Sequence, residues 1–159
     1  MPKATSETTI TSITLNYKCG TNTDFNEVFQ ITSMQTLRDF AALTKSGQTN
    51  LNARLVNDID FKNGTFTGIG NVNNHYKGTF DGNGKTISNI KIINKAKGTG
   101  LFNYVEGATI SNLTIKNVTV NSSAEYYECT GALIGCAYGV NLNNINVSSG
   151  TIYGKNNTA

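Results

Sequence analysis

The stretch from Thr86 to Ile152 repeats a short pattern, and this repetition decides the fold class. The pattern reads TISNIKI at 86–92, TISNLTI at 109–115 and NLNNINV at 141–147. Each copy has an apolar residue, an asparagine two positions later, and apolar residues one and three positions after that asparagine. A second element precedes the last two copies, as Gly100-Leu101-Phe102 and as Ala132-Leu133-Ile134. Repetition at this spacing is typical of solenoids, propellers and repeat arrays.

Two offsets superpose the copies. A shift of 23 positions places the first copy on the second, and a shift of 32 positions places the second on the third. The copies are rich in Ile, Val and Thr and are interrupted by Gly and Asn, which is the composition of strands and turns. We therefore predict an all-β fold, a single-stranded right-handed parallel β-helix with one coil for roughly every 20–25 residues.

The asparagines of the three copies share one position in the pattern. If the coils stack in this register, Asn89, Asn112 and Asn144 lie above one another. Stacked asparagine side chains can form a hydrogen-bonded ladder, and asparagine tolerates the left-handed backbone conformation that tight corners need. The sequence therefore predicts an asparagine ladder along one corner of the solenoid.

One segment, Ser33–Ser46, is predicted to be an α-helix. Ser33 can cap its first turn, and Gly47 can end it. We expect this helix to cap the apolar end of the solenoid, with partner binding as the alternative. Residues 1–50 then form N-terminal strands and the cap helix, and residues 51–159 form the coils of the same structural domain. The apolar face of the helix comprises Met34, Leu37, Phe40, Ala41 and Leu43 or Thr44.

Composition excludes several classes of partner. The chain has 159 residues, a net charge of +3 and only 14% charged residues, without a basic run that carries interleaved aromatics. This argues against nucleic-acid binding. No apolar stretch is long enough to span a membrane. Four lysines, Lys85, Lys91, Lys95 and Lys97, indicate a solvated face, or alternatively a surface for an anionic glycan.

The pattern resembles the GLUG-repeat family of bacterial surface proteins over roughly Ile31 to Ile152. The segments that carry the resemblance are Leu37–Ala41, Asn57–Phe61, Phe66–Gly70, Gly78–Ile87 and the two elements at 100–102 and 132–135. Asn103 and Ala132 depart from the family pattern, because each stands where glycine is usual.

The resemblance implies a non-catalytic β-helix module of a secreted or cell-surface bacterial protein, adhesin-like, that binds or spaces. Its expected partner is a host or cell-surface glycan or protein, and it implies neither catalytic residues nor a cofactor. The chain does not open with a signal-peptide pattern, so secretion is implied by the resemblance alone.

The alternative is a carbohydrate-active enzyme, a polysaccharide lyase or hydrolase, or its substrate-binding fragment, because the same fold hosts such activities. A glycosidase needs two facing carboxylates, and the chain has only ten acidic residues, few of them in the repeats. His75 is the sole histidine, so a zinc protease motif is missing and any catalytic triad would have to use it. We therefore predict that the protein is not an enzyme.

The offsets imply an insertion of about nine residues at Asn121–Glu128, because 32 exceeds 23 by that amount. Loops on a rigid scaffold often carry function, and tyrosines beside carboxylates could stack on a sugar and bond its hydroxyls. The predicted ligand-binding residues are Glu125, Tyr126, Tyr127 and Glu128; the alternative is a surface loop without a role.

We predict no metal site. Calcium bound by Asp58, Asp60 and Asp81 across adjacent coils is a weaker hypothesis, because the sequence lacks the ligand series of a calcium loop.

The three cysteines, Cys19, Cys129 and Cys136, are expected to be thiols. The run from Thr130 to Tyr138 reads as nearly continuous strand, and seven extended steps exceed about 20 Å, which is beyond the reach of a disulfide.

The C-terminal residues Lys155–Ala159 lie where a further coil is expected to begin. An uncapped solenoid end exposes strand edges that invite pairing. The sequence therefore predicts either a fragment of a longer solenoid or an end that another chain covers. In the second case the protein is an assembly module that pairs through its open C-terminal edge.

Overall fold

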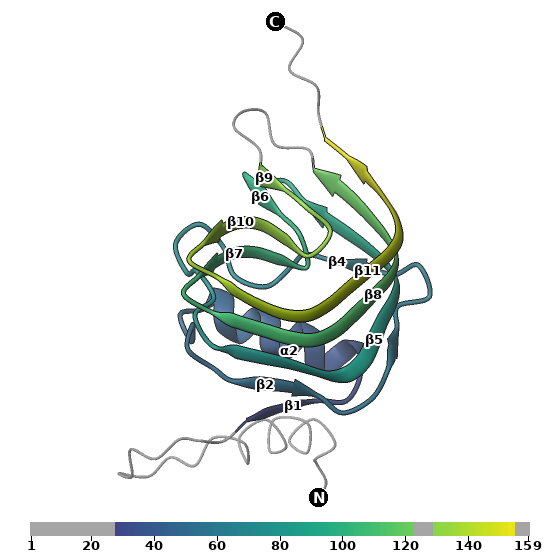
Figure 1. Cartoon of the computed structure of the whole chain (residues 1–159). Coiled ribbons are helices and arrows are strands. Elements are labelled where there is room, and N and C mark those ends of the chain that lie inside the picture. The colour runs from purple at the N-terminus through teal and green to yellow at the C-terminus, as the bar shows by residue number, and fades with distance from the viewer. Residues whose placement is uncertain (1–27, 123–128, 155–159) are drawn as a thin grey trace, which may run out of the picture.

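The computed structural model describes residues 28–122 and 129–154. In this part of the chain, parallel strands stack into a solenoid of about three coils, with one helix at the N-terminal side. The coils wind in a right-handed sense from the N-terminal end to the C-terminal end (Figure 1). The predicted all-β parallel β-helix with an N-terminal helix is therefore confirmed.

The elements follow one another in an order that alternates long and short strands. Their bounds are β1 (Phe29–Ile31), α2 (Met34–Lys45), β2 (Ala53–Leu55), β3 (Ile59–Asp60), β4 (Thr65–Phe66), β5 (Thr79–Asn94), β6 (Gly98–Thr99), β7 (Phe102–Glu106), β8 (Thr109–Ser122), β9 (Cys129–Thr130), β10 (Ile134–Tyr138) and β11 (Asn141–Tyr153).

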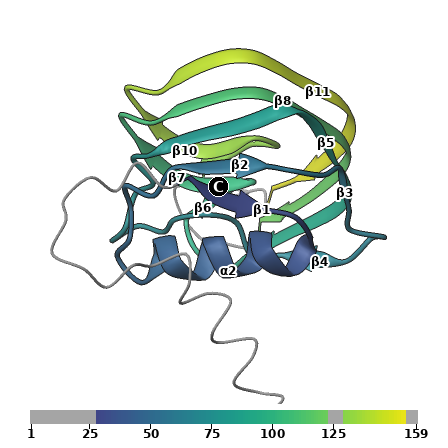
Figure 2. The same cartoon turned by 90° about the horizontal axis from the view of Figure 1, so that it is seen from below.

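The strands form three sheets. The largest has the order β1-β2-β5-β8-β11, with β3 and β4 also paired to β5, and all of its pairings are parallel. The other two sheets are the pairs β10–β7 and β6–β9. Figure 2, which looks along the solenoid from its N-terminal end, shows the long strands curving around one side of the coils and α2 lying on the opposite side.

The register between coils confirms one predicted offset and corrects the other. Ile115 pairs with Val147, as the shift of 32 predicts. Ile87, however, pairs with Ile115, which is 28 positions later, so the predicted shift of 23 is wrong and a coil is longer than predicted. The error arose because similar segments precede two different corners of a coil, one at Asn89 and the other at Asn112.

The insertion is also shorter than predicted. Asn94 pairs with Ser122 and Gly98 pairs with Cys129. Four positions separate the first residues of these pairs and seven separate the second, so the later coil is only three residues longer at this point.

The core fills the inside of the coils. Inward-facing positions of β8 are buried aliphatic residues, and the strands before it place similar residues below them, as the alternation of a half-buried strand requires. Leu55, Ile59 and Phe61 point inward as predicted, and each is at most 2% exposed. The buried aliphatic residues of β5 and β8 are Ile87, Ile90, Ile92, Ile110, Leu113, Ile115, Val118 and Val120.

The helix forms where the sequence predicts it. The Ser33 side chain accepts a hydrogen bond from the backbone of Thr36, and the Thr36 side chain accepts one from the backbone of Ser33, so the two form a reciprocal cap. Gly47 follows the helix with φ of 114°, a conformation that suits glycine. Four residues of the predicted apolar face are buried, namely Leu37, Phe40, Ala41 and Thr44.

Cys129 and Cys136 form a disulfide, so the predicted pair of separate thiols is wrong. The segment is not one extended strand, because the chain turns between β9 and β10, and these two strands pair in different sheets. The turn brings the two Cα atoms to 5.2 Å, well within disulfide range.

Two other predictions fall beyond the described residues. Residues 1–27 of the segment expected to form N-terminal strands, and with them the third cysteine, Cys19, lie outside that part of the chain. The one helix that the described residues form is too short and too polar to cross a lipid bilayer.

Candidate functional site

Polar side chains line two corners of the solenoid. The corner residues Asn89, Asn112, Asn117, Asn144 and Ser149 all have φ near 53°, in the left-handed region. Asparagine adopts this conformation more readily than most residues. In each coil, a corner therefore holds a short polar side chain directly above or below the corner side chain of the next coil.

The first row runs along one corner. The Asn112 amide donates to Asp81 at 3.0 Å, and the Asn144 amide donates to Asn112 at 3.1 Å. This confirms that Asn112 and Asn144 stack as predicted. Asn89, the third residue predicted for this row, lies instead in the second row, because the offset between its coil and the next is 28 positions.

The second row runs along the other corner. The Asn89 amide donates to Asp60 at 2.8 Å, and the Asn117 amide donates to Asn89 at 3.0 Å. The Ser149 hydroxyl then donates to Asn117 at 2.7 Å. The predicted single ladder is thus two ladders, and in both the side chains donate toward the N-terminal end.

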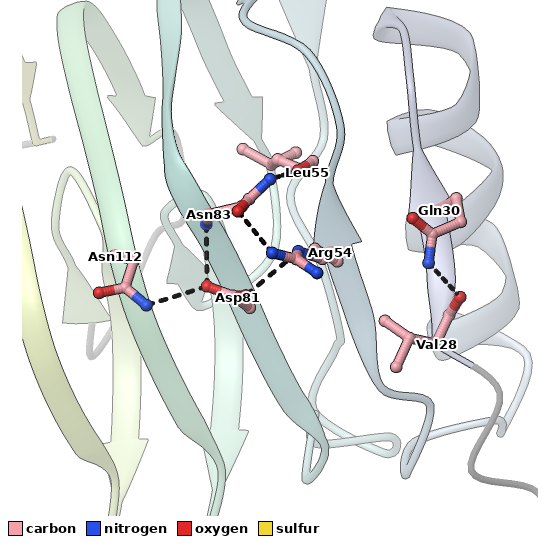
Figure 3. Close-up of polar contacts among 7 residues, drawn as sticks. All are labelled: Val28, Gln30, Arg54, Leu55, Asp81, Asn83 and Asn112. Atoms are coloured by element: carbon pink, nitrogen blue, oxygen red, sulfur yellow. Dashed lines mark hydrogen bonds and ion pairs between the residues drawn. The ribbon is translucent and has the colours of Figure 1, made fainter.

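Both rows begin with a carboxylate, which can accept hydrogen bonds but has none to donate when ionised. Arg54 pairs with Asp81 at 3.4 Å and donates to Asn83 at 2.6 Å (Figure 3). Burial raises the pKa of Asp81, but hydrogen bonds from Asn112 and the Asn83 backbone, and the Arg54 charge, outweigh it and leave that pKa below its usual value. The pKa of Asp60 is also lowered, first by the hydrogen bond from Asn89.

The C-terminal end of the solenoid is open in the described structure. Within this part of the chain, β11 pairs only with β8, so its other edge has free backbone groups. The inward positions of β11 repeat those of β8, yet Leu142, Val147 and Ile152 are 52%, 43% and 49% exposed. Their partners in β8 are fully buried, namely Ile110, Ile115 and Val120.

This end also lacks charge. Residues 129–154 contain no Asp, Glu, Lys, Arg or His. Natural edge strands commonly carry charged residues that prevent pairing with another chain. We name the surface formed by Leu142, Ile145, Val147 and Ile152 on β11 the open end. It combines an unpaired edge, exposed aliphatic side chains and neutrality, which are the properties of a strand-pairing surface.

The residues singled out from sequence occupy different places. The predicted ligand-binding residues Glu125, Tyr126, Tyr127 and Glu128 lie outside the described residues. The described residues hold no group of three His, Cys, Asp or Glu side chains suited to a metal. Asp58 accepts instead from the Thr86 backbone at 2.8 Å, and Asp60 and Asp81 begin separate rows.

His75 packs in a small cluster on the outer face of β7 and β10. Its imidazole lies 3.4 Å from the Glu106 carboxylate and stacks on the rings of Tyr104 and Tyr138. Sequence reasoning treated His75 only as a catalytic candidate and did not single out the tyrosines. The shift of 32 positions could have placed β10 beside β7, but nothing in the sequence marks His75 as their neighbour.

Comparison of the chain with protein-family models, with curated proteins and with solved structures finds no match.

Proposed function

We propose that this protein is a non-catalytic, adhesin-like β-solenoid module of a secreted or cell-surface bacterial protein, and that it assembles by pairing its open end with that of a second copy. The open end carries this proposal, because it offers thirteen residues of β11 as an edge beside an exposed aliphatic floor. Strand addition at such an edge joins main-chain hydrogen bonds with side-chain burial.

Two further observations support the assignment to a surface protein. The GLUG-like elements occupy equivalent positions, since Phe102 pairs with Ile134 in adjacent coils. The disulfide between Cys129 and Cys136 fits an oxidising compartment, where such bonds persist. Both observations agree with the bacterial surface role that the sequence resemblance implies.

A second copy fits the open end better than a charged partner does. A neutral surface meets itself without repulsion, and residues 129–154 contain no Asp, Glu, Lys, Arg or His. The corners at Asn144 and Ser149 divide β11 into three straight segments, 141–143, 145–148 and 150–153. In a dimer with a two-fold axis through the middle segment, the first segment of one copy lies against the third segment of the other, and the paired strands run antiparallel. Such self-complementary interfaces are the commonest in homodimers.

Sedimentation velocity over a range of concentrations tests this proposal. We expect the wild-type chain to form dimers and Val147→Lys to be monomeric, because the lysine places a charge on the aliphatic floor at the centre of the interface. Asn146→Lys is the matched control, since it adds the same charge to the same strand on the outward face. Circular dichroism checks that each variant keeps its strand content.

A wild-type chain that stays monomeric at its highest soluble concentration would contradict the proposal. Loss of the dimer in both lysine variants would also contradict it, because net charge rather than the aliphatic floor would then control association.

A further inference from the structure

The His75 cluster has an aromatic side that reaches solvent. The imidazole stacks on Tyr104 at 5.3 Å between centroids with a 14° angle, and on Tyr138 at 5.7 Å with a 3° angle. Tyr104 is only 6% exposed, whereas Tyr138 is 56% exposed. The buried contacts fix the orientation of the stack, and Tyr138 presents a large part of its surface to solvent.

A polar side adjoins this stack. Glu106 Oε2 lies 3.0 Å from Lys77 Nζ and 3.4 Å from His75 Nδ1. Both contacts use the same carboxylate oxygen. The Glu106 and Lys77 side chains are each about half exposed, at 50% and 44%. Both charged side chains therefore present part of their surface to solvent, where a ligand can reach them.

A hollow of about 280 Å³ lies beside these groups and is lined by Gly47, Thr49, Val72, Asn73, Asn74, His75, Lys77 and Glu106. Tyr138 does not line the hollow itself and is joined to it through its stack on His75. Its wall at 71–74 is braced, because the Asn71 side chain accepts from the backbone of Asn73 and Asn74. The Asn74 amide donates to the carbonyl of Lys45 at the end of α2. These hydrogen bonds fix the loop at 71–74, so one wall of the hollow is formed by ordered backbone.

We propose that this hollow and the Tyr138 ring bind a neutral saccharide. A sugar ring has an apolar face of C–H groups that packs on an aromatic face, and an edge of hydroxyls that donate to carboxylates and accept from ammonium and amide groups. Tyr138 supplies the face, and Glu106, Lys77 and Asn73 supply the polar groups. The charges of Lys77 and Glu106 cancel, which favours an uncharged ligand over a uronate or sulfate.

This inference rests on the proposed binding role of the module, and it assigns that role a site and a ligand class. The site lies on the outer face of the coils, whereas the dimer surface is the inward floor of β11. Saccharide binding and dimer formation can therefore be lost separately.

Saturation-transfer difference NMR on the full chain tests the inference. The probes are neutral oligomers of glucose, galactose and mannose, with uronate oligomers as the acidic arm. We expect at least one neutral oligomer to bind and Tyr138→Ala to weaken its Kd about tenfold, as loss of an aromatic contact does. Tyr138→Phe should bind like wild type, since it keeps the ring.

Tyr153→Ala is the matched control, because Tyr153 is equally exposed at 56% but belongs to β11 and lies outside the ring stack. It should leave the Kd unchanged, and Glu106→Gln should weaken it. Binding of no neutral oligomer, binding of acidic oligomers alone, or equal loss in Tyr138→Ala and Tyr153→Ala would each overturn the inference. Val147→Lys should still bind saccharide, so failure at this site and failure of the dimer are distinguishable.

Discussion

The two ends of the solenoid use the same repeat and have opposite properties. At the N-terminal side, the ring of Phe40 packs against Phe29, Tyr76 and Phe80, and the side chain is fully buried. At the C-terminal side, Ile152 holds an inward position but is 49% exposed. The comparison teaches that the pattern of a repeat specifies which way a side chain points. Whether that side chain is core or surface depends on the presence of another layer.

The largest test of this comparison is truncation of one apolar side chain at each end. Phe40→Ala should lower the free energy of unfolding by about 3–5 kcal/mol, because it leaves a cavity under α2. Ile152→Ala should cost about 0.5 kcal/mol or less in the monomer, since half of its side chain is already exposed. Urea unfolding followed by circular dichroism measures both. Equal losses at the two ends would mean that the open end is covered in solution.

The second test concerns the disulfide of the last coil. Cys129→Ser combined with Cys136→Ser should cost about 2 kcal/mol, because a short closed loop in the unfolded chain gains freedom. In a repeat protein the loss should be confined to the neighbouring coils. Hydrogen exchange should therefore show faster exchange in β10 and β11, with β2 unchanged. A uniform change along the chain would contradict local coupling.

The third test compares an interior rung with a terminal rung of the same row. Asn112→Gly removes two hydrogen bonds and should cost about 1–2 kcal/mol, whereas Asn144→Gly removes one and should cost about half as much. Glycine tolerates the left-handed backbone of both corners, so the comparison isolates the side-chain bonds. The alanine variants should each lose about 1–2 kcal/mol more through backbone strain. Equal costs for the two glycine variants would show that the row adds no stability beyond the corner conformation.

The smallest test concerns the acidic first rungs. The pKa values of Asp60 and Asp81 are lowered from 3.8 in the folded chain. Their contribution to stability is therefore complete above that value and is lost as the pH falls through the lower, folded pKa values. We expect a modest decrease in the urea midpoint below about pH 4, because both carboxylates are near the surface. The double variant Asp60→Asn, Asp81→Asn should show a weaker decrease over the same range.

The sequence predicted the solenoid, the helix with its Ser33 cap, and the register between the last two coils. These features follow from local chemistry and from a repeat whose copies occupy equivalent places. The register of the first copy was wrong because Asn89 and Asn112 stand at different corners with nearly the same surrounding residues. Sequence similarity alone does not distinguish two corners that need the same backbone conformation.

The other features that the sequence did not reveal depend on where the chain turns and on which segments the coils bring together. The disulfide was missed because a sequence of strand-forming residues does not reveal that the chain turns between Cys129 and Cys136. The His75 cluster was missed because its members lie on three separate segments, which only the coil register brings together. The aliphatic residues of β11 were foreseeable from the shift of 32, and the lack of charge at residues 129–154 can be read from the sequence.

The two side-chain rows also bear on how the molecule folds during synthesis. Every rung after the first donates toward the N-terminal end. The first rungs are acceptors: Asp60 accepts from the Lys62 backbone, and Asp81 accepts from the Asn83 backbone and pairs with Arg54. Because the ribosome releases the N-terminal coils first, each coil that emerges later meets acceptors that are already in place. The direction of these hydrogen bonds therefore favours assembly of the solenoid coil by coil from its N-terminal end.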